Sequence, residues 1–518
     1  MRDFISKYTI GIILVIFGLL GIAVIWISSP WGIGVGYDSI FYLSASDNIL
    51  SGSGLSRFDG YGNTIPLTHF PPLYSFTLAG FSLITGFESD LAARILAAVF
   101  FGFLVGLSGW LVYRHTRSLL ASVVGSTFVL VSPVLLDVSF MAMSELLFLV
   151  LLLLMIDFLN KYLLHGNMVV LIIAAIFASL MYLTRYVGLT AVALGALSIL
   201  IFHSSTWVKK AKDLIIFVSI SMVPMLIFYA RNWYLTGSMT NRIIAYHPPT
   251  IVQIRQGLST ISTWLLPARI NPTFRLVVLG LFLIAIVTLI VLSYFRDKQN
   301  QEVKEHEIGA RQFVLLLVLY AIIYIVMVIF SLTFFDASTK LNDRILSPIY
   351  LVGIIAGLIT IWNSSWFEEY VFVRYGVIAI FLVFIGINFL RGYDVLTSMR
   401  KDGRGFSGKE WNSSETVAAL TKLPPGTLLF SNEAFAIYYL AGIPANWIPE
   451  NYDPVKDKED ENYSQRIGLM RDEIISHNGA LVIFNSISKH NVYASIDELS
   501  RGLSLFRKAE DGAIFTSP

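Results

Sequence analysis

The chain contains no cysteine and little charge. Of its 518 residues, 14% are Asp, Glu, Lys or Arg, whereas soluble domains carry about 25%. The absence of cysteine excludes disulfides, thiol nucleophiles and cysteine-ligated metals. The shortage of charge excludes a disordered chain, a coiled coil and a typical soluble enzyme. A net charge of +2 gives no basic field for nucleic acid, and 55% hydrophobic residues indicate a polytopic membrane protein.

The charge that is present is concentrated near the C-terminus. About 31 of the charged residues lie after residue 390, in the last quarter of the chain. Short β-like runs at 426–432 and 480–486 alternate there with helical patterns, which indicates a small α/β unit. We therefore predict a transmembrane domain over residues 1–390 and an extracytoplasmic α/β domain over residues 391–518.

Long apolar runs before residue 390 predict an all-α transmembrane bundle. A helix needs about 20 apolar residues to cross the hydrocarbon core of a bilayer. About eleven runs approach that length, at residues 9–28, 91–113, 119–135, 146–163, 168–184, 187–203, 213–231, 273–295, 312–334, 345–362 and 371–390.

Basic residues orient the bundle. They gather in the short loops on the N-terminal side of the membrane, for example at Arg114, Lys161, Lys209 and Arg296. By the positive-inside rule this side is cytoplasmic. We expect a multi-pass protein of the plasma (inner) membrane, with its N-terminus in the cytoplasm. The first outer loop, 29–90, the loops 232–272 and 335–344, and the C-terminal domain then lie outside.

Ionisable groups at the outer rim are candidates for function, because charge at membrane depth is costly. Asp38 and Tyr42 are spaced i, i+4 and would share a helix face. A carboxylate that is partly covered by apolar groups could have the raised basicity that a general base needs. The alternative is a structural role for Asp38, as a helix N-cap or an interface anchor.

Two further candidates lie at the ends of predicted outer loops. His69 precedes a diproline and could bind a metal, move protons or contact phosphate, or could simply be a loop histidine. Glu145 opens the fourth span. The positive end of the helix dipole is a sufficient structural reason for an acid there, and a functional role requires that it face the same cavity as Asp38.

Three arginines on the outer side contradict the charge rule. Arg185, Arg231 and Arg344 carry a planar fork that suits phosphate. Alternatively, they are anchors that extend to the interface, and Asp343 could pair with Arg344. No GxxxxGK[ST], GxGxxG, HExxH or GxSxG motif is present, so nothing indicates a nucleotide donor on the inner side.

Several segments together resemble the GT-C class of polytopic glycosyltransferases, in the branch of protein O-mannosyltransferases and lipid A aminoarabinose transferases. The resemblance covers most of the chain. The segments that carry it are YDSIFYLSASDNILSGSGL, HFPPLYS, SELLF, LTRYVGL, RNWYLTGS, NDRILSPIY and the tail WNSSETVAALTKLPPGTLLFSNEAFAIYYLAGIPANWIP.

The resemblance implies sugar transfer at the outer membrane face. The donor would be a sugar on a polyprenyl phosphate, and the acceptor a hydroxyl of a lipid, glycan or protein. Asp38 matches the proposed general base, and Glu145 matches an acidic residue near the start of the fourth span, so the resemblance implies catalytic roles for both. The loop of His69 contributes a metal ligand or a phosphate contact in some relatives. Several relatives have a basic residue where this chain has Phe70.

Chemistry on such a donor requires no cofactor, because a polyprenyl phosphate is already a good leaving group. Attack by an acceptor oxygen, deprotonated by Asp38, would invert the anomeric centre in one step. Tyr42, His69, Arg185, Arg231 and Arg344 are the residues expected to bind the donor phosphate or the substrate. Whether Asp38, His69 and Glu145 converge on a divalent metal is left open, since no metal-ligand spacing supports it.

Other classes of protein remain as alternatives. A secondary transporter or flippase would carry charges in mid-span and show inverted repeats, and neither is evident. A glycan polymerase or ligase would have a large late outer loop instead of a separate domain after the last span. A non-catalytic scaffold could retain the same fold.

Overall fold

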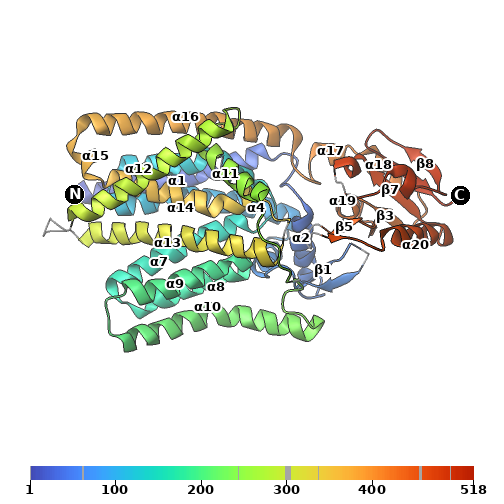
Figure 1. The fold of residues 1–518 in the computed structure, drawn as a ribbon, viewed down its shortest axis with the longest axis horizontal. Helices are drawn as coiled ribbons and strands as arrows, with labels where there is room; N and C mark the ends of the chain where they lie inside the picture. Colours follow the sequence, from blue (N-terminus) through green and yellow to red (C-terminus); the bar gives the residue numbers. More distant parts are fainter. Residues whose placement is uncertain are drawn as a thin grey trace.

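The computed structural model describes residues 2–60, 63–242, 244–297, 305–336, 338–453, 458–489 and 492–518. A bundle of long helices makes up most of the molecule (Figure 1). A mixed unit of strands and short helices caps one end of it, and the N-terminus lies at the opposite end.

The helices of the bundle follow one another with short connections. They are α1 (Arg2–Ser28), α2 (Tyr37–Leu50), α3 (Leu73–Thr85), α4 (Ser89–Thr116), α5 (Leu119–Val131), α6 (Pro133–Ser139), α7 (Glu145–His165), α8 (Met168–Thr184), η1 (Tyr186–Gly188), α9 (Leu189–Phe202), α10 (Trp207–Thr236), α11 (Ile251–Leu265), α12 (Pro272–Asp297), α13 (Glu305–Phe334), α14 (Asp343–Trp362), α15 (Ser365–Glu369) and α16 (Val371–Asp402), with the hairpin β1 (Ser56–Phe58) and β2 (Thr64–Pro66) between α2 and α3.

Every predicted span coincides with one helix or, at 119–135 and 187–203, with two consecutive helical segments, so the expectation of an all-α transmembrane bundle is confirmed. Within the described residues, seven helices are long and apolar enough to cross a membrane. The pair α5 and α6, bent by 53° where Pro133 opens α6, would make an eighth. Met168–Thr184, Tyr186–Phe202 and Pro272–Phe282 are shorter apolar helices. The count of about eleven spans stays a prediction.

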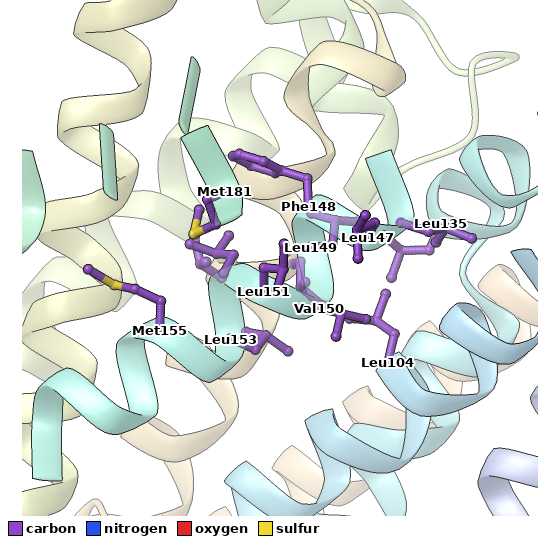
Figure 2. Packing of buried hydrophobic residues seen from close by; sticks show 14 of the residues in the cluster. Leu104, Leu135, Leu147, Phe148, Leu149, Val150, Leu151, Leu153, Met155 and Met181 are labelled. Atoms are coloured by element: carbon purple, nitrogen blue, oxygen red, sulfur yellow. The ribbon is translucent and has the colours of Figure 1, made fainter. Parts of the chain in front are cut away.

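The leucine-rich helix α7 lies at the centre of the bundle. Its side chains are buried on all sides, as expected for a helix that is apolar all round. Figure 2 shows Leu147, Leu149 and Leu151 among Leu104 of α4 and Leu135 of α6. This packed centre gives the polar residues at the start of α7 a rigid support.

Helices α1 and α4 approach each other through glycines. A Cβ atom at Gly102 would lie 2.4 Å from the carbonyl oxygen of Gly18, and one at Gly21 would lie 2.9 Å from the Cα of Gly102. Small residues at such crossings allow close van der Waals contact in membranes, where no hydrophobic force draws the helices together.

The C-terminal unit contains a five-stranded mixed sheet with the strand order β4-β3-β7-β9-β8. Strand β3 is parallel to β4 and β7, whereas β9 is antiparallel to β7 and β8. Its elements are α17 (Lys409–Asn412), α18 (Glu415–Leu420), β3 (Leu429–Ser431), α19 (Ala434–Ala441), β4 (Asn446–Trp447), β5 (Tyr452–Asp453), β6 (Lys458–Glu459), α20 (Tyr463–Ser476), β7 (Ala480–Phe484), η2 (Asn485–Lys489), α21 (Ile496–Leu499), β8 (Ser504–Lys508) and β9 (Gly512–Thr516).

The two β-like runs of the sequence contain the central strands β3 and β7. All five residues of β7 are buried, which explains the continuous apolar pattern of ALVIF. Helix α16 continues to Asp402, past the predicted end of the transmembrane domain at residue 390. The division of the chain into 1–390 and 391–518 stays a prediction.

Candidate active site

A cavity of about 600 Å³ opens at the end of the bundle next to the C-terminal unit. Helices α2, α10, α13 and α14, the turn η1 and the loops before α3 and α14 form its walls. The ionisable side chains in its lining are Asp38, His69, Arg185, Arg242, Asp336, Lys340 and Arg344, together with several tyrosines. Such a concave site with converging polar groups is the usual form of a ligand pocket.

Helix α2 carries Asp38 and is held in place by its entry segment. The amide of Gly34 donates to the carbonyl of Phe140 (2.9 Å), and the amide of Phe406 donates to the carbonyl of Val35 (2.7 Å). A Cβ atom at Gly34 would lie 2.5 Å from the carbonyl oxygen of Phe140. Three distant segments of the chain therefore fix where α2 begins.

The first turn of α2 settles one alternative for Asp38. The N-cap of the helix is Gly36, whose amide donates to the hydroxyl of Ser39 (3.1 Å). Asp38 is therefore in the first turn and is not the cap. Its side chain is 31% exposed and lines the cavity.

Arg344 connects the two acidic candidates. Its Nη2 donates to Oδ2 of Asp38 (2.7 Å), and its Nε donates to Oε1 of Glu145 (2.5 Å). Among the described residues no hydrogen bond reaches the other oxygen of Asp38, Oδ1. One arginine fork thus orients the carboxylate of Asp38 and leaves one of its oxygens available.

Glu145 is buried behind the arginines. The residue is 4% exposed and is absent from the lining of the cavity. Its Oε1 accepts from Arg344 and also forms an ion pair with Nη1 of Arg185. One carboxylate buried between two guanidinium groups holds both in place, and together with Asp38 it balances their charge. The cluster of Asp38, Glu145, Arg185 and Arg344 is named here the four-charge cluster.

Tyr42 lies one turn after Asp38, as the i, i+4 spacing predicts, and also lines the cavity. Its hydroxyl lies 3.3 Å from that of Ser144. Burial raises the pKa of Tyr42 to about 12, so this phenol stays protonated at neutral pH and can donate a hydrogen bond. Phe70, where several relatives have a basic residue, packs its ring 5.2 Å from that of Tyr42.

His69 lines the cavity as an uncharged ring. Burial, with the positive charges of Arg242 and Arg57, lowers its pKa to about 4. The imidazole is therefore neutral at pH 7 and acts only through hydrogen bonds. It lies beside Phe70, with 5.0 Å between the ring centroids.

Arg231 is not part of the cavity lining. Its guanidinium donates to the carbonyls of Leu67 (3.1 Å) and Leu55 (2.5 Å) and braces the first outer loop from α10. Its assignment as a phosphate ligand stays a prediction without a contact to support it.

The neighbouring acid Asp343 has a partner other than Arg344. Asp343 accepts from the indole of Trp264 (2.8 Å), and Arg344 instead bonds to Asp38 and Glu145. The alternative in which Asp343 pairs with Arg344 is therefore not what the structure has.

Sequence reasoning overlooked two cations. Arg242 and Lys340 lie in loops of the same end and line the cavity, and the Arg242 guanidinium stacks 5.0 Å from the ring of Tyr186. Both loops were predicted to be outer, so the charge-rule argument that selected Arg185 could have found them as well.

The same geometry bears on a divalent metal. Among the described residues no three His, Asp or Glu side chains come together as a metal site. Between Asp38 and Glu145, where a cation would have to bind, lies the guanidinium of Arg344. The side chains of Asp38, His69 and Glu145 as placed therefore do not fit a shared metal ion.

Comparison with known families matches the middle of the chain. The model of the family described as dolichyl-phosphate-mannose-protein mannosyltransferase matches residues 69–229. This range begins at His69 and includes Glu145 and Arg185. Among curated proteins no sequence match is found.

Solved structures share the fold over nearly the whole chain. ArnT from Cupriavidus metallidurans bound to undecaprenyl phosphate is 12% identical, with a TM-score of 0.58 over 97% of both chains. AglB, the archaeal oligosaccharyltransferase from Archaeoglobus fulgidus, in complex with an inhibitory peptide and a dolichol-phosphate, is 13% identical, with a TM-score of 0.55 over 93% of this chain and 70% of that one. The arabinofuranosyltransferase AftD from Mycobacteria is 13% identical, with a TM-score of 0.50 over 97% of this chain and 39% of that one. The chain is thus an integral membrane protein with the fold of the GT-C class of polytopic glycosyltransferases, the class that its sequence motifs resemble.

Proposed function

We propose that the protein is a glycosyltransferase that moves a sugar from a polyprenyl phosphate to an acceptor hydroxyl of a lipid, glycan or protein. One observation carries the proposal. The cavity brings together three features: the carboxylate of Asp38, which has one oxygen without a hydrogen bond, several cationic side chains, and an apolar wall. The fold shared with enzymes solved with polyprenyl phosphates supports it.

The charge of the cavity suits a phosphodiester. Its lining has four cationic side chains, Arg185, Arg242, Lys340 and Arg344, and two carboxylates, Asp38 and Asp336. Within the four-charge cluster the charges already balance. Arg242 and Lys340 lie outside this cluster, so their positive charges are available to bind a donor phosphate. In a sugar phosphodiester that phosphate carries one negative charge.

The apolar part of the cavity suits the isoprenoid tail. Val187 and Leu189 line it from η1 and α9, and Met327, Val328 and Phe330 line it from α13. These helices belong to the membrane bundle, so a tail that follows this wall stays in an apolar environment from the bilayer to the phosphate.

Transfer then proceeds by a single displacement. The acceptor oxygen attacks the anomeric carbon and the bond from that carbon to the phosphate oxygen breaks. The electron pair leaves with the polyprenyl phosphate, and the acceptor proton passes to Oδ1 of Asp38. Because the attack is opposite to the leaving group, the anomeric configuration inverts. General base catalysis contributes about 10²–10⁴-fold, and the cations stabilise the developing phosphate charge.

Glu145 acts as a positioning residue in this scheme. It is buried, is absent from the lining of this cavity and bonds to both Arg185 and Arg344. Through Arg344 it fixes the orientation of Asp38 and of the phosphate-binding face. A direct catalytic role for Glu145, expected from the resemblance, would need its carboxylate to reach the substrate.

We place the reaction at the outer face of the plasma (inner) membrane, with the N-terminus in the cytoplasm. The basic loops of the sequence support this orientation. A transporter would need polar groups along a path through the bundle, whereas the polar lining of this cavity gathers at the end next to the C-terminal unit.

Native mass spectrometry of the purified full-length protein tests the proposal. We expect bound polyprenyl phosphate on the wild-type chain and at least about tenfold less on the double variant Arg242→Met/Lys340→Met, which removes the two cations outside the four-charge cluster. Arg311→Gln is the matched control, because Arg311 pairs with Glu307 near the opposite end of α13 (3.8 Å). A wild-type protein that binds no polyprenyl phosphate, even when it is added, would overturn the assignment.

A further inference from the structure

A second cavity lies between the C-terminal unit and the first turn of α2. Its volume is about 860 Å³, within the usual range of ligand sites, about 300–1,000 Å³. Its lining includes Tyr37 of the bundle. From the C-terminal unit it includes Trp447, Glu450, Tyr452 and Tyr493. This cavity is named here the acceptor cleft. In Figure 1 α2 lies beside β5 and α19, where the bundle meets the C-terminal unit.

Helix α2 separates the two cavities. Tyr37 lines the acceptor cleft, and the next residue, Asp38, lines the cavity proposed to hold the donor. Consecutive Cα atoms are about 3.8 Å apart, but neighbouring side chains of a helix point in different directions, so the two residues face different cavities. An acceptor of several linked sugars that binds in the cleft would have to pass around α2 to present its end at Asp38.

The wall around Tyr37 is held rigidly. The Tyr37 hydroxyl donates to Oε2 of Glu433 (2.7 Å), and the hydroxyl of Ser486 donates to Oε1 of the same carboxylate (2.6 Å). Glu433 is 3% exposed. Burial and the charge of Glu433 raise the pKa of Tyr37, so the phenol stays protonated and keeps this bond. The cleft is thus pre-organised before any ligand arrives.

Trp447 is fixed in a similar way. Its ring lies 6.0 Å from that of Tyr37 and 5.1 Å from that of Phe435. Gly60 packs against its indole, where a Cβ atom would lie only 2.5 Å from Nε1. Aromatic side chains in fixed positions offer apolar faces on which the C–H groups of a sugar ring can pack.

The polar groups of the cleft are of both signs. Lys458 and Arg466 lie in the lining together with carboxylates such as Glu450 and Asp453. Arg466 pairs with Asp460 at 2.6 Å, and Tyr493 donates to Glu450 at 3.1 Å. The four carboxylates of the lining outnumber its two cations, so charge disfavours an anion, and the choice between a cation and a neutral ligand rests on the aromatic faces. Fixed donors and acceptors beside aromatic faces instead suit an uncharged polyhydroxylated group.

We propose that the acceptor cleft binds neutral sugar residues of a glycan-bearing acceptor. This inference rests on the proposed function, and it narrows the acceptor class to molecules that already carry a glycan. The C-terminal unit would then select the acceptor, while the bundle holds the donor.

The test uses the full-length protein in lipid nanodiscs on an array of short oligosaccharides. The probes are neutral manno-, gluco- and galacto-oligosaccharides, cationic chitosan oligomers and anionic oligogalacturonates. We expect binding to at least one neutral series. Trp447→Ala should weaken it at least about tenfold. Trp366→Ala, a tryptophan of α15 that is 49% exposed, should leave it unchanged.

Because Trp447 also packs against other aromatic rings, Glu450→Ala provides a second variant in the polar part of the lining. It should weaken binding at least about fivefold. Polyprenyl phosphate binding is measured on the same samples, and the wild type, Trp447→Ala and Glu450→Ala should all retain it. Absence of binding to neutral oligosaccharides, binding only to charged probes, or equal binding by wild type and both cleft variants would overturn the inference. Retained lipid binding in that case would leave the proposed donor site intact, whereas its loss from the wild type would count against the proposed function itself.

Discussion

The role assigned to Glu145 makes a quantitative prediction. Glu145→Gln keeps the shape of the side chain but leaves Arg185 and Arg344 without their shared buried counter-charge. Its side chain is 5% exposed, so the loss should cost about 3–5 kcal/mol of unfolding free energy, as for other broken buried pairs. Asp137→Asn is the matched control. It breaks a pair with Arg404 in which the aspartate is 42% exposed, so it should cost at most about 1 kcal/mol.

The assay is unfolding by SDS titration in mixed micelles, with a double-mutant cycle through Arg185→Met. We expect the double variant of Glu145 and Arg185 to be more stable than the sum of the single losses by about 1–3 kcal/mol. A positioning role also predicts that Glu145→Gln weakens donor binding and leaves the pH profile of transfer unchanged. Equal costs for Glu145→Gln and Asp137→Asn, or a coupling energy near zero, would refute the reasoning.

Two further predictions concern the cavity lining. Arg242→Met and Lys340→Met should each weaken polyprenyl phosphate binding by about 5–30-fold at low salt, because each removes a charge-assisted contact of about 1–2 kcal/mol. Titration by native mass spectrometry measures the affinity, and wild-type affinity in both variants would contradict the assignment. For His69, burial lowers the pKa to about 4, so the unfolded chain binds the proton more readily. Its contribution to stability is complete above about pH 6.5 and falls by up to about 3 kcal/mol as the pH drops toward 4. His69→Gln, which does not titrate, should reduce the loss of thermal stability over that range, and an identical pH dependence in both proteins would count against a neutral His69.

The sequence was sufficient to predict the bundle and most members of the candidate site. Long apolar runs are required for helices that cross a membrane, and charges on the outer side are costly unless they have a role. The arrangement of the site depends on contacts between distant residues. Arg344 bonds to Asp38 across 306 positions and to Glu145 across 199. No local pattern encodes such pairings, so the sequence offered Arg344 only as one of three equivalent arginines.

The same explanation applies to Arg231, whose predicted phosphate contact stays a prediction, and to the residues that the sequence did not single out. In the sequence Arg231 is equivalent to Arg185, since both are arginines on the outer side. Arg231 instead donates to two backbone carbonyls of the first outer loop, and no residue pattern predicts such contacts. In the sequence Tyr37 is only one residue of the motif YDSIFYLSASDNILSGSGL. Its role in the acceptor cleft depends on a hydrogen bond to Glu433, which lies 396 positions later. Arg242 and Lys340 lie in loops predicted to be outer, where the charge rule could have identified them.

The rate of transfer by Asp38→Asn tests the central claim most directly. The measurement is single-turnover release of polyprenyl phosphate from a lipid-linked sugar in the presence of acceptor, with donor binding and thermal unfolding followed on the same sample. Loss of the general base should lower the rate by about 10²–10⁴-fold, while donor affinity stays within about threefold of wild type and the protein remains folded. Transfer by Asp38→Asn at the wild-type rate would contradict the account.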